Sequence, residues 1–86
     1  MHPIFASLES ASPSTIGAFL HQVYTEVKKL LQQGIDTAEE RTAVIHAVMA
    51  YYDKYINELV PGAMQTSIRE GIVKGLTAAL ETAATI

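Results

Sequence analysis

The sequence predicts an all-α fold: a small three-helix bundle, with or without a short extra helix at its N-terminus, that we expect oligomerisation to complete. Apolar residues recur at spacings of three and four along most of the chain, which is the period of an amphipathic helix. No segment sustains the alternation of a strand, and no Asn-Gly or Asp-Gly pair marks a hairpin turn. A length of 86 residues predicts a single domain.

The N-terminal third is predicted to contain an arm or short helix over 1–12 and a long helix over 13–33. In the first segment, Ile4, Phe5 and Leu8 fall on one helical face. For the second segment, Ser12 can serve as the N-cap with Pro13 at the first helical position. Gly34 can end this helix, because glycine readily adopts the left-handed conformation of the residue after a helix.

Two further helices are predicted over 38–59 and 62–84. Thr37 followed by Glu40 matches a capping box, which marks the start of the first of them. Pro61 disfavours helical conformation at Val60, so the chain should break there and begin a new helix immediately afterwards.

The composition predicts that a single copy leaves apolar surface uncovered. Apolar residues make up 49% of the chain, charged residues only 17%, and the mean hydropathy is +0.18. A domain of this size buries only about 60–65% of the surface of its unfolded chain. Association is the usual way to cover the remaining apolar area, so we expect a homo-oligomer, with a dimer favoured.

The helix over 38–59 has an unusually wide apolar face. One row of side chains contains Val44, Val48, Tyr51, Tyr55 and Leu59, and a second row contains Ile45, Met49, Tyr52 and Ile56. Either the helix is central in the monomer, or one row meets a partner. Tyrosine suits an interface because it combines an apolar ring with a hydroxyl group. The predicted interface residues of this helix are Met49, Tyr51, Tyr52, Tyr55 and Ile56.

The last helix carries a row of small residues beside a bulky ridge. Ser67, Gly71, Gly75, Ala79 and Ala83 follow one another at intervals of four, next to Met64, Ile68, Ile72, Leu76 and Leu80. Each glycine costs the helix about 1 kcal/mol relative to alanine, which close packing against another helix can offset. That helix is either the first or second helix of the same chain, or a helix of another copy or of a foreign protein. The predicted interface residues here are Gly71, Ile72, Gly75 and Ala79.

The residue types and their spacing give no sign of a catalytic, cofactor or metal site. The chain has no cysteine, which excludes thiol chemistry and disulfides. None of its histidines, His2, His21 and His46, has a His, Asp or Glu four residues further on, and only His46 has an acidic residue, Asp53, two turns away. We therefore expect no metal site and read His21 and His46 as surface residues. No nucleophile with a partner base is visible, so we do not expect an enzyme.

The charge distribution argues against nucleic acid as a partner. The net charge is −3, and the six Lys and Arg residues are scattered, whereas a nucleic-acid interface usually has a basic cluster. No apolar run is long enough to span a membrane and no signal peptide is visible, so we expect a cytoplasmic protein. The leading hypothesis is a non-catalytic module that self-associates through apolar helix faces. The alternatives are a small acidic regulator that blocks a larger protein and, less favoured, a carrier of an apolar ligand.

Overall fold

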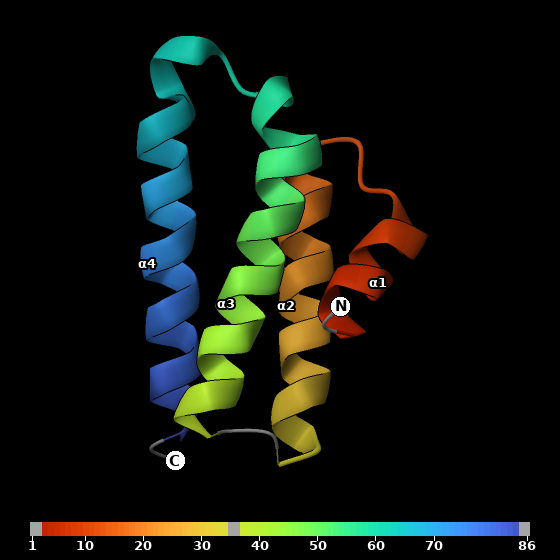
Figure 1. The fold of residues 1–86 in the computed structure, drawn as a ribbon, viewed down its shortest axis with the longest axis vertical. Helices are drawn as coiled ribbons and strands as arrows, with labels where there is room; N and C mark the ends of the chain where they lie inside the picture. The colour runs from red at the N-terminus through yellow and green to blue at the C-terminus, as the bar shows by residue number, and fades with distance from the viewer. Residues whose placement is uncertain (1–2, 35–36, 85–86) are drawn as a thin grey trace.

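The computed structural model describes residues 3–34 and 37–84, and all regular structure in these ranges is helical. Its α-helices are α1 (Pro3–Ala11), α2 (Ile16–Gln32), α3 (Ala38–Tyr51) and α4 (Gln65–Ala84). The predicted all-α bundle is confirmed. The three longer helices lie side by side, and the short α1 crosses α2 and α3 on the side away from α4 (Figure 1).

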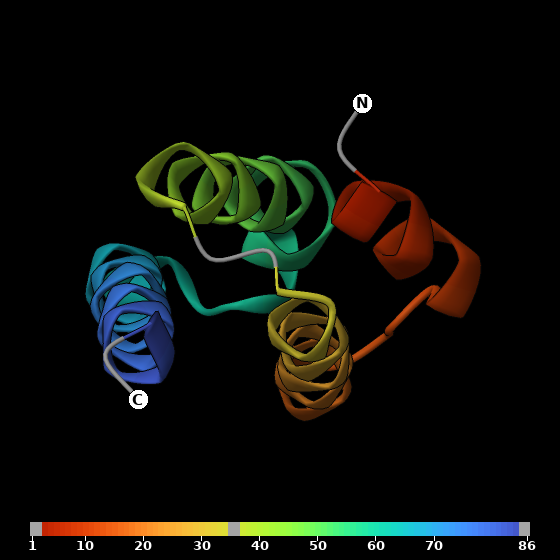
Figure 2. The same ribbon diagram turned by 90° about the horizontal axis from the view of Figure 1, so that it is seen from below.

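The N-terminal segment is a helix that belongs to the core. Ile4 and Leu8, one turn apart on α1, are buried. The ring of Phe5 meets that of Tyr51 edge-on, with 5.7 Å between the ring centroids. The described residues thus form four α-helices, and α1 covers part of α3 that a three-helix bundle would leave exposed (Figure 2).

The start of α2 differs from the prediction. Thr15, not Ser12, is the N-cap: its hydroxyl oxygen accepts a hydrogen bond from the backbone N–H of Ala18 at 3.1 Å. Ser12 instead ends α1, where its hydroxyl donates to the carbonyl of Glu9 at 2.9 Å. The backbone of Ser12 has a φ of 47°, a left-handed conformation that cannot initiate a helix. Residues 12–15 are therefore the connection between two helices.

The two other predicted boundaries in the N-terminal half are confirmed. Gly34 follows α2 with a φ of 79°, the left-handed conformation in which glycine is favoured. The hydroxyl oxygen of Thr37 accepts from the backbone N–H of Glu40 at 3.2 Å and so caps α3.

The segment predicted as one helix over 38–59 changes its winding near its end. After α3 the chain forms a π-helical turn, η1 (Tyr52–Ile56), in which the N–H of Asn57 donates to the carbonyl of Tyr52. A 3₁₀ turn, η2 (Asn57–Leu59), follows. Val60 is extended, as expected before a proline, and a second 3₁₀ turn, η3 (Gly62–Met64), leads into α4.

The side chain of Gln65 ties this irregular segment to the start of α4. Its amide nitrogen donates to the carbonyl of Asn57 at 3.0 Å and to that of Val60 at 3.1 Å. The carbonyl of Asn57 also accepts from the backbone N–H of Val60 at 3.2 Å, so Gln65 supplies it with a second donor. This pair of hydrogen bonds fixes the direction in which α4 leaves the turn.

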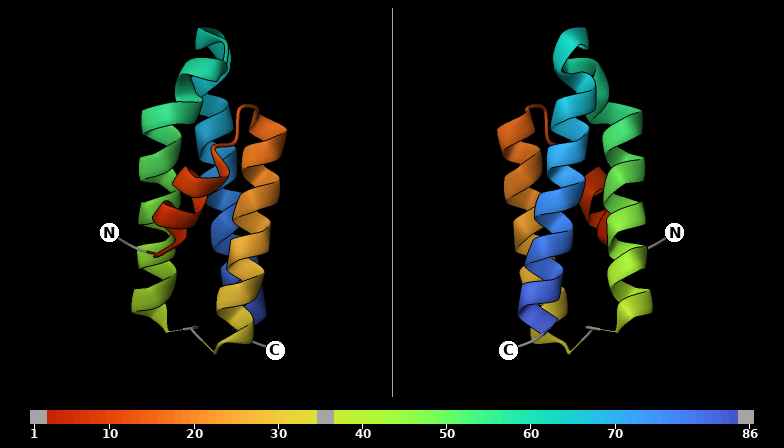
Figure 3. Two further views of the ribbon diagram at one scale, coloured as in Figure 1. Left: turned by 90° about the vertical axis from the view of Figure 1, so that its right-hand side faces the viewer. Right: turned by 90° about the vertical axis from the view of Figure 1, so that its left-hand side faces the viewer.

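The core is centred on α3, which lies between α1 and α4 (Figures 2 and 3). Aromatic rings stack within it: the rings of Phe19 and Tyr51 are almost parallel, with centroids 5.9 Å apart, and Tyr52 lies 6.0 Å from Phe19 on another side. The most deeply buried side chains are Ile4, Leu8, Phe19, Val48, Tyr52 and Ile56. Within the described ranges, no helix combines the length and apolar character needed to cross a membrane.

Candidate functional site

The candidate site is an apolar groove between α2 and α4, on the side of the molecule away from α1. We call it the α2–α4 groove. It has a volume of about 410 Å³. Its lining consists of Ile16, Leu20, Val23 and Tyr24 from α2 and of Ile68, Gly71, Ile72, Gly75 and Leu76 from α4. None of these side chains is charged, so the groove favours an apolar occupant.

The groove exists because α2 and α4 touch only sparsely, while each packs well against other elements. Helix α2 packs against α1, and α4 packs against α3. Val23 and Leu76 are buried at the floor of the groove, whereas Tyr24, on its α2 wall, is 56% exposed. An apolar surface therefore runs from the core out to solvent along this side of the bundle.

Gly71 and Gly75 form the outer part of the α4 wall. Both are exposed, and a Cβ atom added to either would meet nothing within 4 Å apart from its own helix backbone and chain neighbours. The possibility that the first or second helix of the same chain fills the row of small residues is therefore wrong. The glycines make room for a close contact that the single chain does not itself use.

Four of the predicted interface residues lie in the core instead. Met49, Tyr51, Tyr52 and Ile56 are between 0% and 6% exposed, so they have no surface to offer a partner. The physical reason is that this segment is central: α1 and α4 both pack against α3, and Phe19 of α2 packs against Tyr51 and Tyr52. The prediction that these residues meet a partner is corrected accordingly.

The other predicted interface residues keep access to solvent. Gly71 and Gly75 are exposed, and Ile72 and Ala79 are half-buried on the same helix. Tyr55 is 37% exposed but lies on another side, far from the α2–α4 groove in the bundle. The structure thus brings Gly71, Ile72 and Gly75 together in the groove and leaves Tyr55 outside it.

The α2 wall of the groove was missed by the sequence analysis. Ile16 and Leu20 belong to an apolar stripe along α2 of the kind that normally faces a core, but both are only half-buried. Together with Tyr24 they are spaced by four residues and form one edge of that stripe. The only available signal was the position of Tyr24 at the margin of the stripe.

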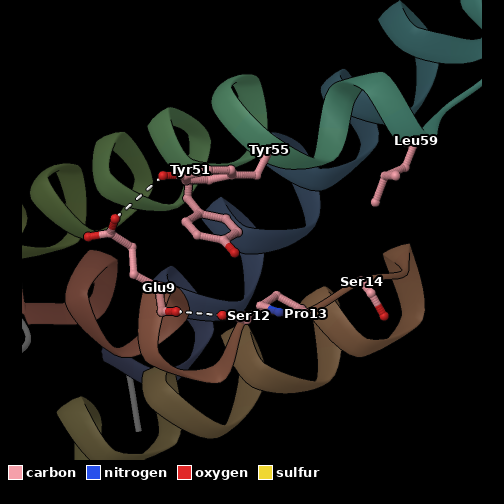
Figure 4. Close-up of a pocket in the computed structure, with 7 residues that line it drawn as sticks. All are labelled: Glu9, Ser12, Pro13, Ser14, Tyr51, Tyr55 and Leu59. Atoms are coloured by element: carbon pink, nitrogen blue, oxygen red, sulfur yellow. Dashed lines mark hydrogen bonds between the residues drawn. The ribbon is translucent and has the colours of Figure 1, made fainter.

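A second cavity, of about 350 Å³, lies where the connection between α1 and α2 faces the end of α3 (Figure 4). The hydroxyl of Tyr55 donates to the carboxylate of Glu9 at 3.5 Å, a long contact. The hydroxyl of Tyr51 points into the cavity (Figure 4). Burial, followed by the nearby Tyr55 and Glu9, raises the pKa of Tyr51 above its ordinary value of 10.0. This phenol therefore stays protonated and can act as a hydrogen-bond donor near neutral pH.

Neither cavity brings together groups that would form a metal or catalytic centre. Within residues 3–34 and 37–84, no three His, Asp or Glu side chains converge on one point. His21 and His46 are exposed on α2 and α3, and His2 lies outside the described residues. The second cavity offers one carboxylate, two phenols and the hydroxyls of Ser12 and Ser14, and the hydroxyl of Ser12 donates to a backbone carbonyl.

Comparison of this chain with models of protein families, with curated proteins and with solved structures finds no match in any of the three.

Proposed function

We propose that this protein is a non-catalytic helical interaction module that self-associates through the α2–α4 groove. The observation that carries the proposal is the open space at Gly71 and Gly75 on the wall of an apolar groove. Two glycines in an exposed helix interior cost about 2 kcal/mol in helix propensity. Among the described residues, no other element lies within 4 Å of a Cβ placed at either glycine, whereas close packing against a second helix would offset the cost.

The apolar character of the groove also supports association. Solvent-exposed apolar surface that is continuous over two helices is typical of protein contact sites. Tyr24, with 56% of its surface exposed, supplies an aromatic ring of the kind enriched in interfaces. Half-buried Ile68 and Ile72 flank the glycines and would be covered by the same partner.

Sedimentation velocity over a concentration series tests the proposal. We expect the chain to shift from 9.3 kDa towards twice that mass as its concentration rises through the micromolar range. Gly75→Leu should prevent this shift because the larger side chain blocks close approach. A Cβ atom at Gly75 meets no other element among the described residues, and leucine favours helix more than glycine does, so the variant should remain folded.

Gly62→Leu is the matched control. Gly62 has equally open surroundings but does not line the groove, so this variant should self-associate like the parent chain. A parent chain that stays at 9.3 kDa at every concentration contradicts self-association. Equal association of the two leucine variants contradicts the groove as its site.

The volume and lining of the groove favour a second candidate, a carrier of an apolar ligand. Small-molecule sites typically have volumes of about 300–1,000 Å³ and mostly apolar walls. The groove, at about 410 Å³, falls in this range. Native mass spectrometry of freshly purified protein would reveal a retained molecule, and Gly75→Leu should then abolish its retention.

A further inference from the structure

The hydroxyl of Tyr51 is a hydrogen-bonding group that the core holds in place at the second cavity. The side chain is only 3% exposed, because Phe19 stacks on its ring with centroids 5.9 Å apart and Phe5 meets the ring edge-on. The hydroxyl points into the cavity (Figure 4), and none of the described residues forms a hydrogen bond with it. A precisely placed polar group in a mostly apolar cavity is what orients a bound small molecule.

The carboxylate of Glu9 lines the same cavity and keeps most of its capacity to accept hydrogen bonds. Among the described residues its one contact is with the hydroxyl of Tyr55 at 3.5 Å, which is at the limit of hydrogen-bond distance. The ammonium group of Lys54 lies over the ring of Tyr55, 5.0 Å from its centroid, and forms no ion pair with Glu9 in the described chain. The charge of Glu9 is therefore available to a ligand.

The rest of the described lining is uncharged and indicates the class of ligand. Pro13, Leu59 and the two tyrosine rings supply apolar walls, and Ser12 and Ser14 supply hydroxyls. A lining with one negative charge and no positive charge disfavours anions and favours a cationic group. A single carboxylate is too few ligands for a metal ion. We propose that the second cavity binds a small organic amine with an apolar body and a hydrogen-bond acceptor oxygen.

The two polar groups of the cavity have separate roles in this site. The ammonium group of the ligand donates to the carboxylate of Glu9, and the hydroxyl of Tyr51 donates to the oxygen of the ligand. Figure 4 shows the carboxylate and the hydroxyl apart from each other, so the ammonium group and the oxygen should lie at opposite ends of the ligand. Its apolar body would cover Leu59, which is 47% exposed. The volume of about 350 Å³ is within the range of small-molecule sites, about 300–1,000 Å³.

A set of matched probes tests this inference with the full chain. Para-methoxyphenethylamine carries an ammonium group and an ether oxygen at opposite ends of an apolar ring. Phenethylamine lacks the oxygen, para-methoxyphenylethanol has a hydroxyl in place of the ammonium group, and para-methoxyphenylpropionate has a carboxylate there. Each probe is titrated into the isotope-labelled protein, and the amide chemical shifts report both the affinity and the place of binding.

We expect the methoxy amine to bind with a Kd in the millimolar range and several-fold more tightly than the other three probes. The largest shifts should fall in residues 12–15 and 51–59, which border the cavity. This site is separate from the α2–α4 groove, so the expectation does not depend on self-association.

Two variants assign the two contacts. Glu9→Gln should weaken binding of the methoxy amine several-fold and leave binding of the methoxy alcohol unchanged. Tyr51→Phe should weaken binding of the methoxy amine and leave binding of phenethylamine unchanged. Simple loss of structure would weaken all probes alike, so this dependence on the probe distinguishes binding roles from structural ones. Glu70→Gln is the matched control: it removes one negative charge from an exposed position on α4 and should leave every affinity unchanged.

Several outcomes would overturn the inference. The absence of shifts with the methoxy amine at tens of millimolar would exclude the site, and shifts confined to the lining of the α2–α4 groove would place binding elsewhere. Equal binding of all four probes would show that neither polar group selects the ligand. Equal weakening by Glu9→Gln and Glu70→Gln would show only a general attraction between the amine and an acidic protein. Sedimentation measures self-association separately, so none of these outcomes bears on the proposed function.

Discussion

The guanidinium group of Arg69 on α4 donates two hydrogen bonds to the carboxylate of Asp53 in η1, at 2.9 and 3.0 Å. Such bidentate pairs have a more defined geometry than most surface ion pairs. The pair joins the irregular end of the α3 segment to the helix that carries the groove. It therefore helps to set where α4 stands relative to the rest of the bundle.

We predict that Asp53→Asn lowers the free energy of unfolding at pH 7 by about 0.2–1 kcal/mol, because both partners are about half exposed and solvent screens them. The hydrogen bonds from Arg69, with its charge, hold the pKa of Asp53 below its ordinary value of 3.8. The ionised form thus stabilises the folded state. This contribution is fully present above the unfolded-state pKa and is lost as the pH falls through the lower folded-state pKa.

Urea unfolding of the parent chain and of Asp53→Asn at neutral pH and below pH 4 checks this prediction. The difference between the two proteins should shrink as the pH is lowered. A difference that stays constant with pH would show that the carboxylate charge is not what stabilises the contact.

The hydroxyl of Tyr52 gives a second prediction. Tyr52 is fully buried, and its hydroxyl has no hydrogen-bond partner among the described residues. An unsatisfied buried polar group costs about 1–3 kcal/mol. Tyr52→Phe should therefore leave the free energy of unfolding unchanged or raise it.

Tyr51→Phe is the matched control for Tyr52→Phe, since its hydroxyl faces the second cavity and can reach water. We expect this control to change the stability little. A loss of more than about 1 kcal/mol in Tyr52→Phe would mean that the buried hydroxyl does have a partner in solution.

The position of the α2 N-cap gives a third prediction. Thr15→Ala should cost about 1 kcal/mol of stability, since it removes the acceptor for the N–H of Ala18. Ser12→Ala should cost less, because the hydroxyl of Ser12 is exposed and makes a local bond to Glu9. Thermal unfolding followed by circular dichroism measures the loss of stability in each variant. A larger loss in Ser12→Ala than in Thr15→Ala would indicate that Ser12 is the N-cap.

The contribution of α1 gives a fourth prediction. Leu8→Ala should destabilise the protein by about 2–5 kcal/mol, because it leaves a cavity at a fully buried position. Leu59→Ala removes the same atoms from a residue that is 47% exposed and should cost much less. Comparable losses for the two variants in urea unfolding would show that α1 does not belong to the cooperative core.

The sequence predicted correctly those helix ends that depend on the properties of a single residue. Gly34 and Thr37 mark helix ends because the left-handed φ and the capping hydroxyl are properties of single residues. Ser12 misled the prediction because it is an equally good cap by type. Its actual role was decided by where α1 ends, which depends on how Ile4 and Leu8 pack.

The candidate site could be predicted only in part, because one of its walls depends on how two helices are placed relative to each other in the tertiary structure. The small residues at 71 and 75 identified one wall of the groove from their spacing alone. The other wall depends on the separation of α2 from α4, which no periodicity in either helix encodes. Tyr51 and Tyr52 were assigned to an interface because their burial depends on tertiary packing: both lie against Phe19 of α2, and Tyr51 also lies against α1, a helix whose existence the sequence left open.

The wide turn at Tyr52–Ile56 has a consequence for how the length of this chain can vary. An α-helical turn closes a hydrogen bond over four residues, whereas this turn closes one over five, from Asn57 to Tyr52. Because five residues of this wide turn cover about the same rotation as four residues of an α-helix, deleting a single codon here would give an ordinary α-turn and leave the chain downstream facing nearly the same way. Loss of one residue from this stretch should therefore disturb the position of α4 less than loss of one from the regular part of α3, where each residue turns the downstream chain by about 100°.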